Sequence, residues 1–271
     1  MSKPRALTAA QTIVSLALAI ALVGGGYLVC TAPPLSPALS SALAWDDLSP
    51  FSKDQLSRVA AAARDFSFGS HDRTALYRTI YQVNRELEGD RSSGLSNAAQ
   101  PAGFPDLDGL SEQSDGAAFA SSFASARDAY VFDRSAVEHL DDVNRVATAA
   151  LPILAICILV GAGGLFALAR VAGRRAAAVP LIASSTLVVG LFAVLGLWAA
   201  IDFMGMFSAF HGIFFTQGTW EFSESSLLIC ALPTELWMAL GAIWLTVSLL
   251  ACSATGLIGV RLLREKTRAS L

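Results

Sequence analysis

The chain has 271 residues, of which 54% are hydrophobic and only 15% are charged. Soluble globular proteins average about 45–50% apolar and about 25% charged residues, so this composition favours a membrane protein over a soluble enzyme. The formal net charge of −3 argues against a nucleic-acid-binding protein, because such proteins present a basic surface. The 4 cysteines are too few for a disulfide scaffold, and they form no C-x-x-C motif.

Four stretches without a charged residue are each long enough to cross a bilayer as a helix. They cover residues 6–30, 146–169, 176–201 and 236–260. A helix is expected because a spanning segment must satisfy its backbone hydrogen bonds internally. The first stretch exceeds the apolar core of a cleaved signal peptide, which favours a retained membrane helix over that alternative. The sequence therefore predicts an all-α membrane protein with four transmembrane helices.

The charges between these stretches orient the predicted helices. Residues 1–5, 170–175 and 261–271 together carry nine basic residues and one acidic residue. Residues 31–145 and 202–235 carry ten basic and twenty-one acidic residues. Short basic segments remain in the cytoplasm, so we expect both termini inside and two extracytoplasmic loops, one long and one short. The whole chain is then expected to be a single multi-pass membrane domain.

The long loop begins with two helical patterns. Ser52 and Gln55 have the spacing of a capping box, and apolar residues follow at helical intervals, which predicts an amphipathic helix over 52–66. A second helical pattern covers residues 75–87. These helices are expected to lie on the bundle or on the membrane surface.

The second half of the long loop changes in composition. Ser, Ala and Gly make up 20 of the 36 residues in 91–126. Such a composition buries little apolar surface, so we expect a flexible insertion there. Residues 129–146 again have a helical pattern and are expected to continue into the second membrane helix.

Two of the 3 histidines lie next to predicted membrane boundaries. His139 precedes the second membrane stretch by seven residues, which corresponds to about 10 Å of helix. His211 follows the third stretch by ten residues, so a short turn would return it to the same depth. Because a short loop joins the second and third helices, we expect them to be antiparallel neighbours and the two histidines to approach each other. His71 has no membrane context and is expected to be an ordinary loop residue.

The surroundings of the two histidines suggest proton transfer. Asp142 shares a helical face with His139, where a carboxylate could fix the imidazole tautomer and raise its basicity. His211 lies among aromatic residues of the kind found at the lipid headgroup level. The aromatic residues expected to face substrate or lipid are Phe210, Phe214, Phe215 and Trp220.

The same residues also have plainer interpretations. A histidine beside an aspartate commonly belongs to a solvated polar face, and interfacial aromatic residues commonly act as anchors. A two-histidine metal site is a further alternative, for which only Asp142 and Glu138 are obvious additional ligands. The chain could also be a non-catalytic accessory or assembly protein that binds a partner through its outer loop.

Three sequence strings resemble the bacterial four-helix membrane family of the lipoprotein intramolecular transacylase Lit. They are Glu138-His139-Leu140-Asp141-Asp142-Val143, Phe210-His211-Gly212-Ile213-Phe214-Phe215 followed by Trp220, and Leu232-Pro233-Thr234-Glu235-Leu236-Trp237. The resemblance covers the four spans and residues 129–240, and more loosely 51–69. Leu140, Gly212 and Leu236 depart from the family pattern, in which we expect methionine, histidine and phenylalanine.

The resemblance implies a cofactor-free enzyme of the bacterial cytoplasmic membrane, with its active site at the outer leaflet. Such an enzyme moves the sn-2 acyl chain of a diacylglyceryl lipoprotein to the α-amino group of its N-terminal cysteine, which gives a lyso-form lipoprotein. Its partners are the lipoprotein substrate and membrane lipids, without nucleic acid.

The resemblance also implies roles for individual residues. His139 and His211 are the catalytic candidates, Asp142 would orient His139, and Trp237 would face the lipid-borne substrate. One histidine would take the amine proton, and the other would protonate the leaving oxygen. A histidine that forms an acyl-enzyme is the alternative.

Overall fold

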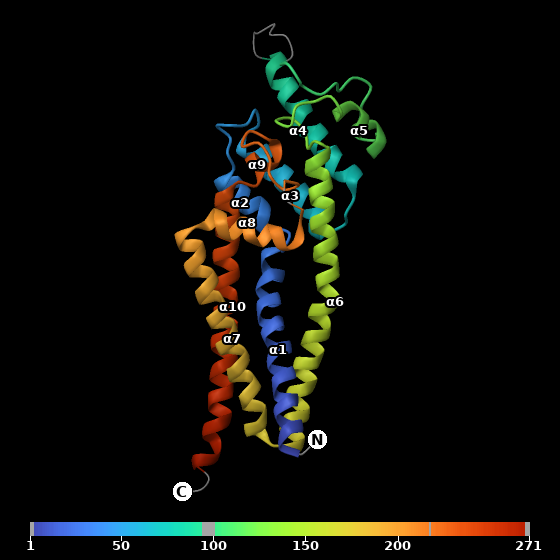
Figure 1. The fold of residues 1–271 in the computed structure, drawn as a ribbon. Helices are drawn as coiled ribbons and strands as arrows, with labels where there is room; N and C mark the ends of the chain where they lie inside the picture. The colour runs from blue at the N-terminus through green and yellow to red at the C-terminus, as the bar shows by residue number, and fades with distance from the viewer. Residues whose placement is uncertain (1–2, 94–100, 217, 269–271) are drawn as a thin grey trace. The chain divides into compact units, whose positions relative to one another are not determined.

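A computed structural model describes residues 3–93, 101–216 and 218–268, and the regular elements in these ranges are helices (Figure 1). The chain divides into two compact units. Unit 1 comprises Met1–Cys30, Ala149–Phe210 and Gly241–Leu271. Unit 2 comprises Thr31–Thr148 and His211–Leu240. The long loop, which the sequence assigns to the membrane domain, thus builds most of a compact unit of its own.

Long apolar helices build unit 1. They are α1 (Lys3–Cys30), α7 (Arg174–Ile201), most of α8 (Phe203–Phe214), and parts of α6 (Arg134–Val171) and α10 (Thr234–Arg268). Four of the described helices, α1, α6, α7 and α10, are long and apolar enough to cross a membrane. This confirms the predicted all-α fold with four spans.

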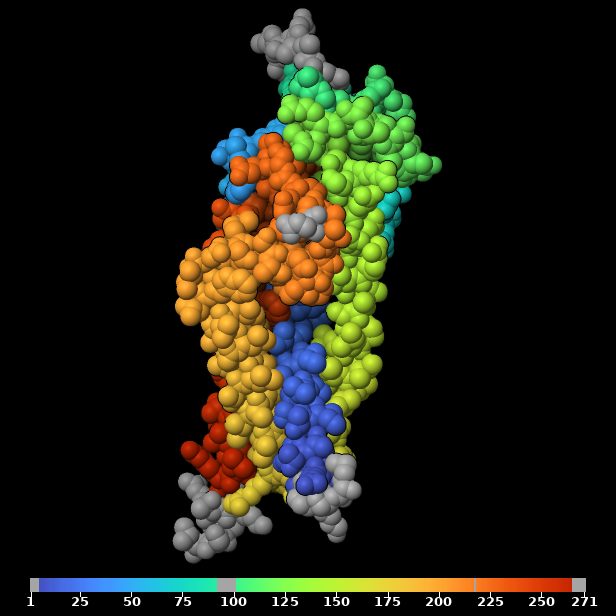
Figure 2. Space-filling view, viewed as in Figure 1, coloured from blue at the N-terminus to red at the C-terminus, as the bar shows by residue number. Residues whose placement is uncertain are grey.

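Glycines bring the helices of unit 1 close together. A Cβ atom added at Gly164 of α6 would lie 2.3 Å from Cγ2 of Val14 in α1. One added at Gly26 of α1 would lie 2.5 Å from Cδ1 of Trp244 in α10, whose Nε1 donates to the carbonyl of Val23 at 2.8 Å. Figure 2 shows α1 in blue between α6 in yellow-green and α7 in amber. Small residues at these contacts permit the close approach of membrane helices.

Unit 1 also exposes large apolar side chains. Among the most exposed are Leu159 (72%), Leu250 (67%), Val194 (66%) and Ile13 (59%). A surface of this kind is unfavourable in water and is expected where lipid tails cover a helix bundle.

Shorter helices build unit 2. They are α2 (Leu35–Leu43), α3 (Lys53–Phe68), α4 (Arg73–Ser93), α5 (Gly116–Phe123) and α9 (Leu227–Ala231), with the first turns of α6 and α10. The predicted capping box is present, because the Ser52 side chain accepts from the Gln55 backbone and the Gln55 side chain accepts from the Ser52 backbone. α3 and α4 confirm the two helical patterns at the start of the long loop.

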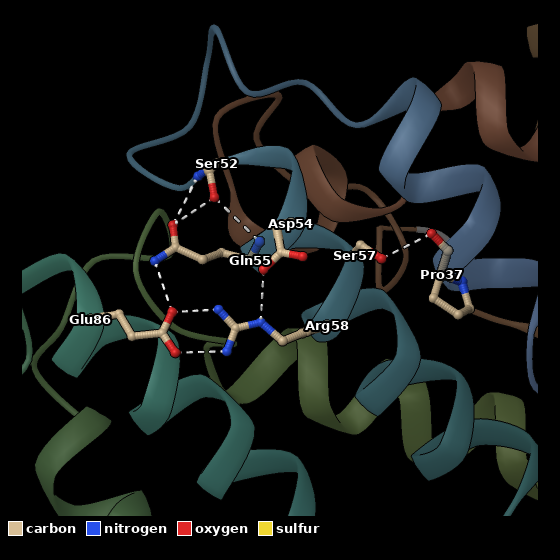
Figure 3. Close-up of polar contacts among 7 residues, drawn as sticks. All are labelled: Pro37, Ser52, Asp54, Gln55, Ser57, Arg58 and Glu86. Carbon is tan, nitrogen blue, oxygen red and sulfur yellow. Dashed lines mark hydrogen bonds and ion pairs between the residues drawn. The ribbon is translucent and has the colours of Figure 1, made fainter.

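A polar network joins α3 to α4 (Figure 3). Arg58 binds both carboxylate oxygens of Glu86, with Nη1 2.7 Å from Oε1, and its Nε lies 3.4 Å from Asp54. Gln55 donates from Nε2 to the same carboxylate at 3.2 Å. The hydrogen bonds from Arg58 hold the pKa of Glu86 below its usual value. The surface side of this helix pair is therefore fixed by charge-assisted hydrogen bonds.

The core of unit 2 includes a segment for which composition predicts little burial. Within 91–126, residues 94–100 lie outside the described residues. In the described part, Leu107, Phe119 and Phe123 are 2%, 0% and 5% exposed and belong to the main core cluster. The Phe119 and Phe123 rings pack on tyrosine rings of α4 at centroid distances of 5.5 and 5.7 Å. The average composition of the segment misleads, because Leu107, Phe119 and Phe123 are buried in the core.

Candidate active site

His139 lies in the second turn of α6, and Asp133 fixes the start of this helix. Asp133 Oδ1 accepts a hydrogen bond from the backbone N–H of Ala136 at 2.8 Å, which satisfies one of the free donors at the helix N-terminus. The charge-free stretch of α6 begins only at Val146. His139 is therefore held on a rigid helix, ahead of its apolar part.

His211 lies in the last turn of α8. The backbone N–H of Phe215 donates to the His211 carbonyl at 2.8 Å, and the chain then turns through Gly218, whose φ of +84° favours glycine. The turn brings back Trp220, which is only 9% exposed. Its ring lies 4.8 Å from the His211 ring, so the returning chain covers the histidine.

The structure brings the two predicted histidines together within unit 2. Their ring centroids are 6.2 Å apart, and their planes differ by 25°. Phe215 packs against both rings, with its centroid 4.9 Å from His139 and 5.6 Å from His211. Phe222 packs on His139 at 5.7 Å. We define the histidine cluster as these two imidazoles with Phe215, Trp220 and Phe222.

The histidine cluster changes the acid–base properties of His139. The pKa of His139 is lowered to about 4, chiefly by burial and also by the charge of His211, whereas Asp142 acts in the opposite direction. Nδ1 of His139 is buried and has no hydrogen-bond partner among the residues that the structure describes. The ring is therefore neutral at neutral pH, with a nitrogen free to accept a proton, and its protonated form is more acidic than an ordinary imidazolium.

Asp142 does not orient His139 in the expected way. Its Oδ1 lies 2.9 Å from Nη1 of Arg145, an ion pair between residues three apart on α6. A hydrogen bond to the His139 ring is not found in the described chain, so Asp142 acts on the ring through its charge. The helical spacing places Asp142 near both His139 and Arg145, three residues away on either side, and it does not decide which of them Asp142 contacts.

The aromatic residues expected to face substrate or lipid divide into two groups. Phe215 and Trp220 belong to the histidine cluster. Phe210, Phe214 and Trp237 are instead 45%, 46% and 37% exposed. Phe222 is a further residue of the site that the sequence does not predict, although it lies only two residues after Trp220.

The structure adds two facts on metal and thiol chemistry. In the described ranges, no group of three or more His, Cys, Asp or Glu side chains is arranged to hold a metal ion. Cys30, Cys157, Cys230 and Cys252 are free thiols.

Comparisons with known proteins agree on one family. The family model described as "Lipoprotein intramolecular transacylase Lit" matches residues 117–237, which include both histidines. No curated protein matches the chain.

Solved structures match over the full length. The in meso structure of the membrane integral lipoprotein intramolecular transacylase Lit from Bacillus cereus has a TM-score of 0.65 at 16% sequence identity, and the match covers 98% of this chain and 100% of that one. Two variants of that protein, with a histidine replaced by arginine or alanine, have TM-scores of 0.56 at 16% and 15% identity. These matches cover 99% and 98% of this chain and 96% and 97% of the variants. Residues 117–237 are thus similar to the Lit family model, and the chain has the fold of the Bacillus cereus protein.

Proposed function

We propose that this protein is a lipoprotein intramolecular transacylase of the bacterial cytoplasmic membrane. It moves the sn-2 acyl chain of a diacylglyceryl lipoprotein to the α-amino group of the lipoprotein's N-terminal cysteine. The observation that carries this proposal is the pair of imidazoles, 6.2 Å apart and bordered by aromatic rings. Two adjacent proton carriers suit a reaction that removes one proton and supplies another.

The reaction needs both proton transfers. The neutral amine nitrogen attacks the ester carbonyl carbon, the new C–N bond forms, and the bond from this carbon to the glycerol oxygen breaks. One of His139 and His211 takes the proton that the nitrogen loses, and the other protonates the departing glycerol oxygen. The product contains an amide and a free hydroxyl, so atoms and charge balance without a cofactor.

The lowered pKa of His139 fits this exchange. At neutral pH the ring is unprotonated and can accept a proton, and its conjugate acid gives the proton up readily. Because amine and ester belong to one lipopeptide, the protein's main task is to hold them together, which is worth several orders of magnitude in rate. The exposed Phe214 and Trp237 supply apolar contacts for the acyl chains.

Two further observations support the location of the reaction. The basic residues near the four spans, and the acidic residues of the two longer connections, favour an orientation with the histidine cluster at the outer leaflet. The matching Bacillus cereus protein is itself named a lipoprotein intramolecular transacylase.

The test expresses this protein in a bacterial strain that leaves its lipoproteins in the diacyl form. Mass spectrometry of the N-terminal lipopeptide distinguishes diacyl from lyso-form lipoprotein. The wild type should produce the lyso form, and His139→Ala and His211→Ala should each reduce it by about 100-fold or more, the usual range for an acid–base residue. Glu138→Gln is the matched control, because this exposed neighbour of His139 pairs with Arg134, and its substitution should leave the product unchanged.

The outcomes separate the candidate functions. Diacyl lipoprotein alone, from an inserted wild-type protein, would contradict transacylation and favour the accessory function. Undiminished lyso-form lipoprotein from both histidine variants would contradict the two-histidine mechanism.

A further inference from the structure

His71, in the connection between α3 and α4, has an unusual backbone. Its φ is +55°, and among the described residues it is the one non-glycine residue with a positive φ. L-amino acids seldom adopt this region, although histidine and asparagine do so more than most. A residue in this conformation persists only when its surroundings hold it, and such positions occur preferentially near functional sites.

The ring of His71 joins the end of α3 to α6. It stacks on the ring of Phe66 at 4.4 Å and 22°, and its Nδ1 lies 2.9 Å from the Phe66 carbonyl oxygen. Its Nε2 lies 3.2 Å from Oδ1 of Asp141. Because Phe66 is only 2% exposed, the ring is fixed against the core on one side and reaches α6 on the other.

Two more contacts attach the same connection to α6. Arg73, the first residue of α4, binds Oδ2 of Asp141. One turn further along α6, Asn144 donates from Nδ2 to the carbonyl of Ser67 at 3.1 Å. We call these contacts of His71, Arg73 and Ser67 with α6 the α6 clamp.

The α6 clamp holds the side of the helix that faces away from the histidine cluster. At about 100° per residue, Asp141 and Asn144 lie about 200° and about 140° around the helix from His139. Contacts on this side oppose rotation of α6 about its axis. Such a rotation would change the separation of His139 from His211, and a displacement of about 1 Å can cost about 100-fold in rate.

We propose that His71 is a positioning residue that fixes the rotation of α6 and so aims His139 at the reacting groups. The proposal rests on the proposed function of His139. It replaces the expectation that His71 is an ordinary loop residue.

Steady-state transfer by purified protein in lipid vesicles, with a synthetic diacylglyceryl lipopeptide, tests the proposal. His71→Asn removes the ring but keeps a side chain that tolerates a positive φ. We expect kcat to fall about 10-fold with KM nearly unchanged, because the substrate contacts remain and only the alignment is lost. Asp141→Asn should act in the same way, and the double variant should be little worse than the stronger single variant, since both break one contact.

Glu86→Gln is the matched control. It breaks the Arg58–Glu86 pair between α3 and α4 without touching α6 (Figure 3). We expect its kcat to equal that of the wild type. A spectroscopic readout that does not require activity accompanies the kinetics: in protein with labelled histidine rings, the NMR signal of His139 should move in His71→Asn and stay in place in Glu86→Gln.

The outcomes are distinguishable. Wild-type kcat and an unmoved His139 signal in His71→Asn would overturn the positioning role, and so would an equal loss of kcat in Glu86→Gln. If the wild type shows no transfer at all, the proposed function fails, and the His139 signal alone then decides whether His71 positions α6.

Discussion

Unit 1 and unit 2 place their apolar side chains in opposite ways. Unit 1 carries large exposed residues such as Leu159 and Leu250, and its buried clusters are small. Unit 2 buries one continuous core around Leu56, Ile80 and Phe119, each 0% exposed. One chain thus contains a helix bundle suited to lipid and a unit with the continuous apolar core of a soluble domain. The histidine cluster lies in this second unit, unit 2.

The charges divide in the same way. Unit 1 contains nine basic and two acidic residues, whereas unit 2 contains ten basic and twenty acidic residues. The ion pairs of Glu86 with Arg58 and of Asp141 with Arg73 lie in unit 2. The net charge of −3 is therefore the sum of two units of opposite sign, each suited to a different solvent.

The largest expected difference concerns large-to-small substitutions. Phe119→Ala empties a fully buried position in unit 2 and should lower the free energy of unfolding by about 3–5 kcal/mol. Leu159→Ala removes a side chain that is 72% exposed and should change the free energy of unfolding by less than about 0.5 kcal/mol. Equal effects would contradict the contrast between the units.

The effect of these substitutions on each unit can be measured in detergent by the labelling of its buried thiol. Cys230 of unit 2 and Cys252 of unit 1 are 0% and 1% exposed, so single-cysteine variants report the opening of each unit by thiol labelling during heating. Burial raises the pKa of Cys230 to about 11, which keeps its thiol unreactive until unit 2 opens. Phe119→Ala should advance the labelling of Cys230.

Two adjacent glycines test the packing of unit 1. A Cβ at Gly26 would lie 2.5 Å from atoms of Trp244 and Ser248, whereas one at Gly25 meets nothing within 4 Å. Gly26→Ala should therefore destabilise unit 1 by about 1–3 kcal/mol through overpacking. Gly25→Ala should be neutral or stabilising, because alanine favours helix more than glycine does. The temperature at which Cys252 becomes labelled measures the stability of both variants. If Gly25→Ala is labelled at a lower temperature than Gly26→Ala, the packing described for unit 1 is contradicted.

Acidification should weaken unit 2 through His139. Above its ordinary pKa of about 6.5 the ring is neutral in both the folded and the unfolded chain, so stability is full. Between pH 6.5 and the folded value of about 4, the unfolded chain binds a proton that the folded chain does not, and stability falls. Thermal unfolding followed by near-UV circular dichroism should show that His139→Gln loses less stability than the wild type between pH 6.5 and pH 4. An identical loss in both proteins would contradict the lowered pKa.

The smallest expected effects come from the pair beside His139. Asp142 raises the pKa of His139, so Asp142→Asn should lower this pKa further. Arg145→Gln should raise it, because the charge of Asp142 is then no longer compensated. The pair is largely exposed, so stability should change by less than about 1 kcal/mol. NMR titration of His139 checks both directions, and shifts of the same sign would contradict the electrostatic argument.

The sequence was informative wherever one local pattern determines the structure. Four charge-free stretches predicted the spans, and the Ser52 and Gln55 spacing predicted the start of α3, because both depend on contacts within a single segment. The number of residues between each histidine and the adjacent membrane stretch also predicted that His139 and His211 lie close together, as they do in unit 2.

Features set by contacts between segments escaped prediction. The burial of Phe119 depends on α4, the Asp142–Arg145 pair depends on side-chain rotamers, and the role of His71 depends on α6. Residue spacing does not signal the partners of Phe119 and His71, and the helical spacing of Asp142 allows both His139 and Arg145 as partners without deciding between them. A polar or Ser/Ala/Gly-rich composition therefore says little about which few side chains of a segment pack inward.

A crossover experiment tests the central claim most directly. Purified protein in vesicles receives two diacylglyceryl lipopeptides, one carrying heavy isotopes in both its sn-2 acyl chain and its peptide and the other unlabelled. Tandem mass spectrometry then reads which acyl chain is attached to which α-amino group. We expect N-acylated lyso-form products that are either fully labelled or unlabelled, and none from His139→Ala or His211→Ala. Mixed products would contradict an intramolecular transfer, and undiminished products from both variants would contradict the histidine cluster as the active site.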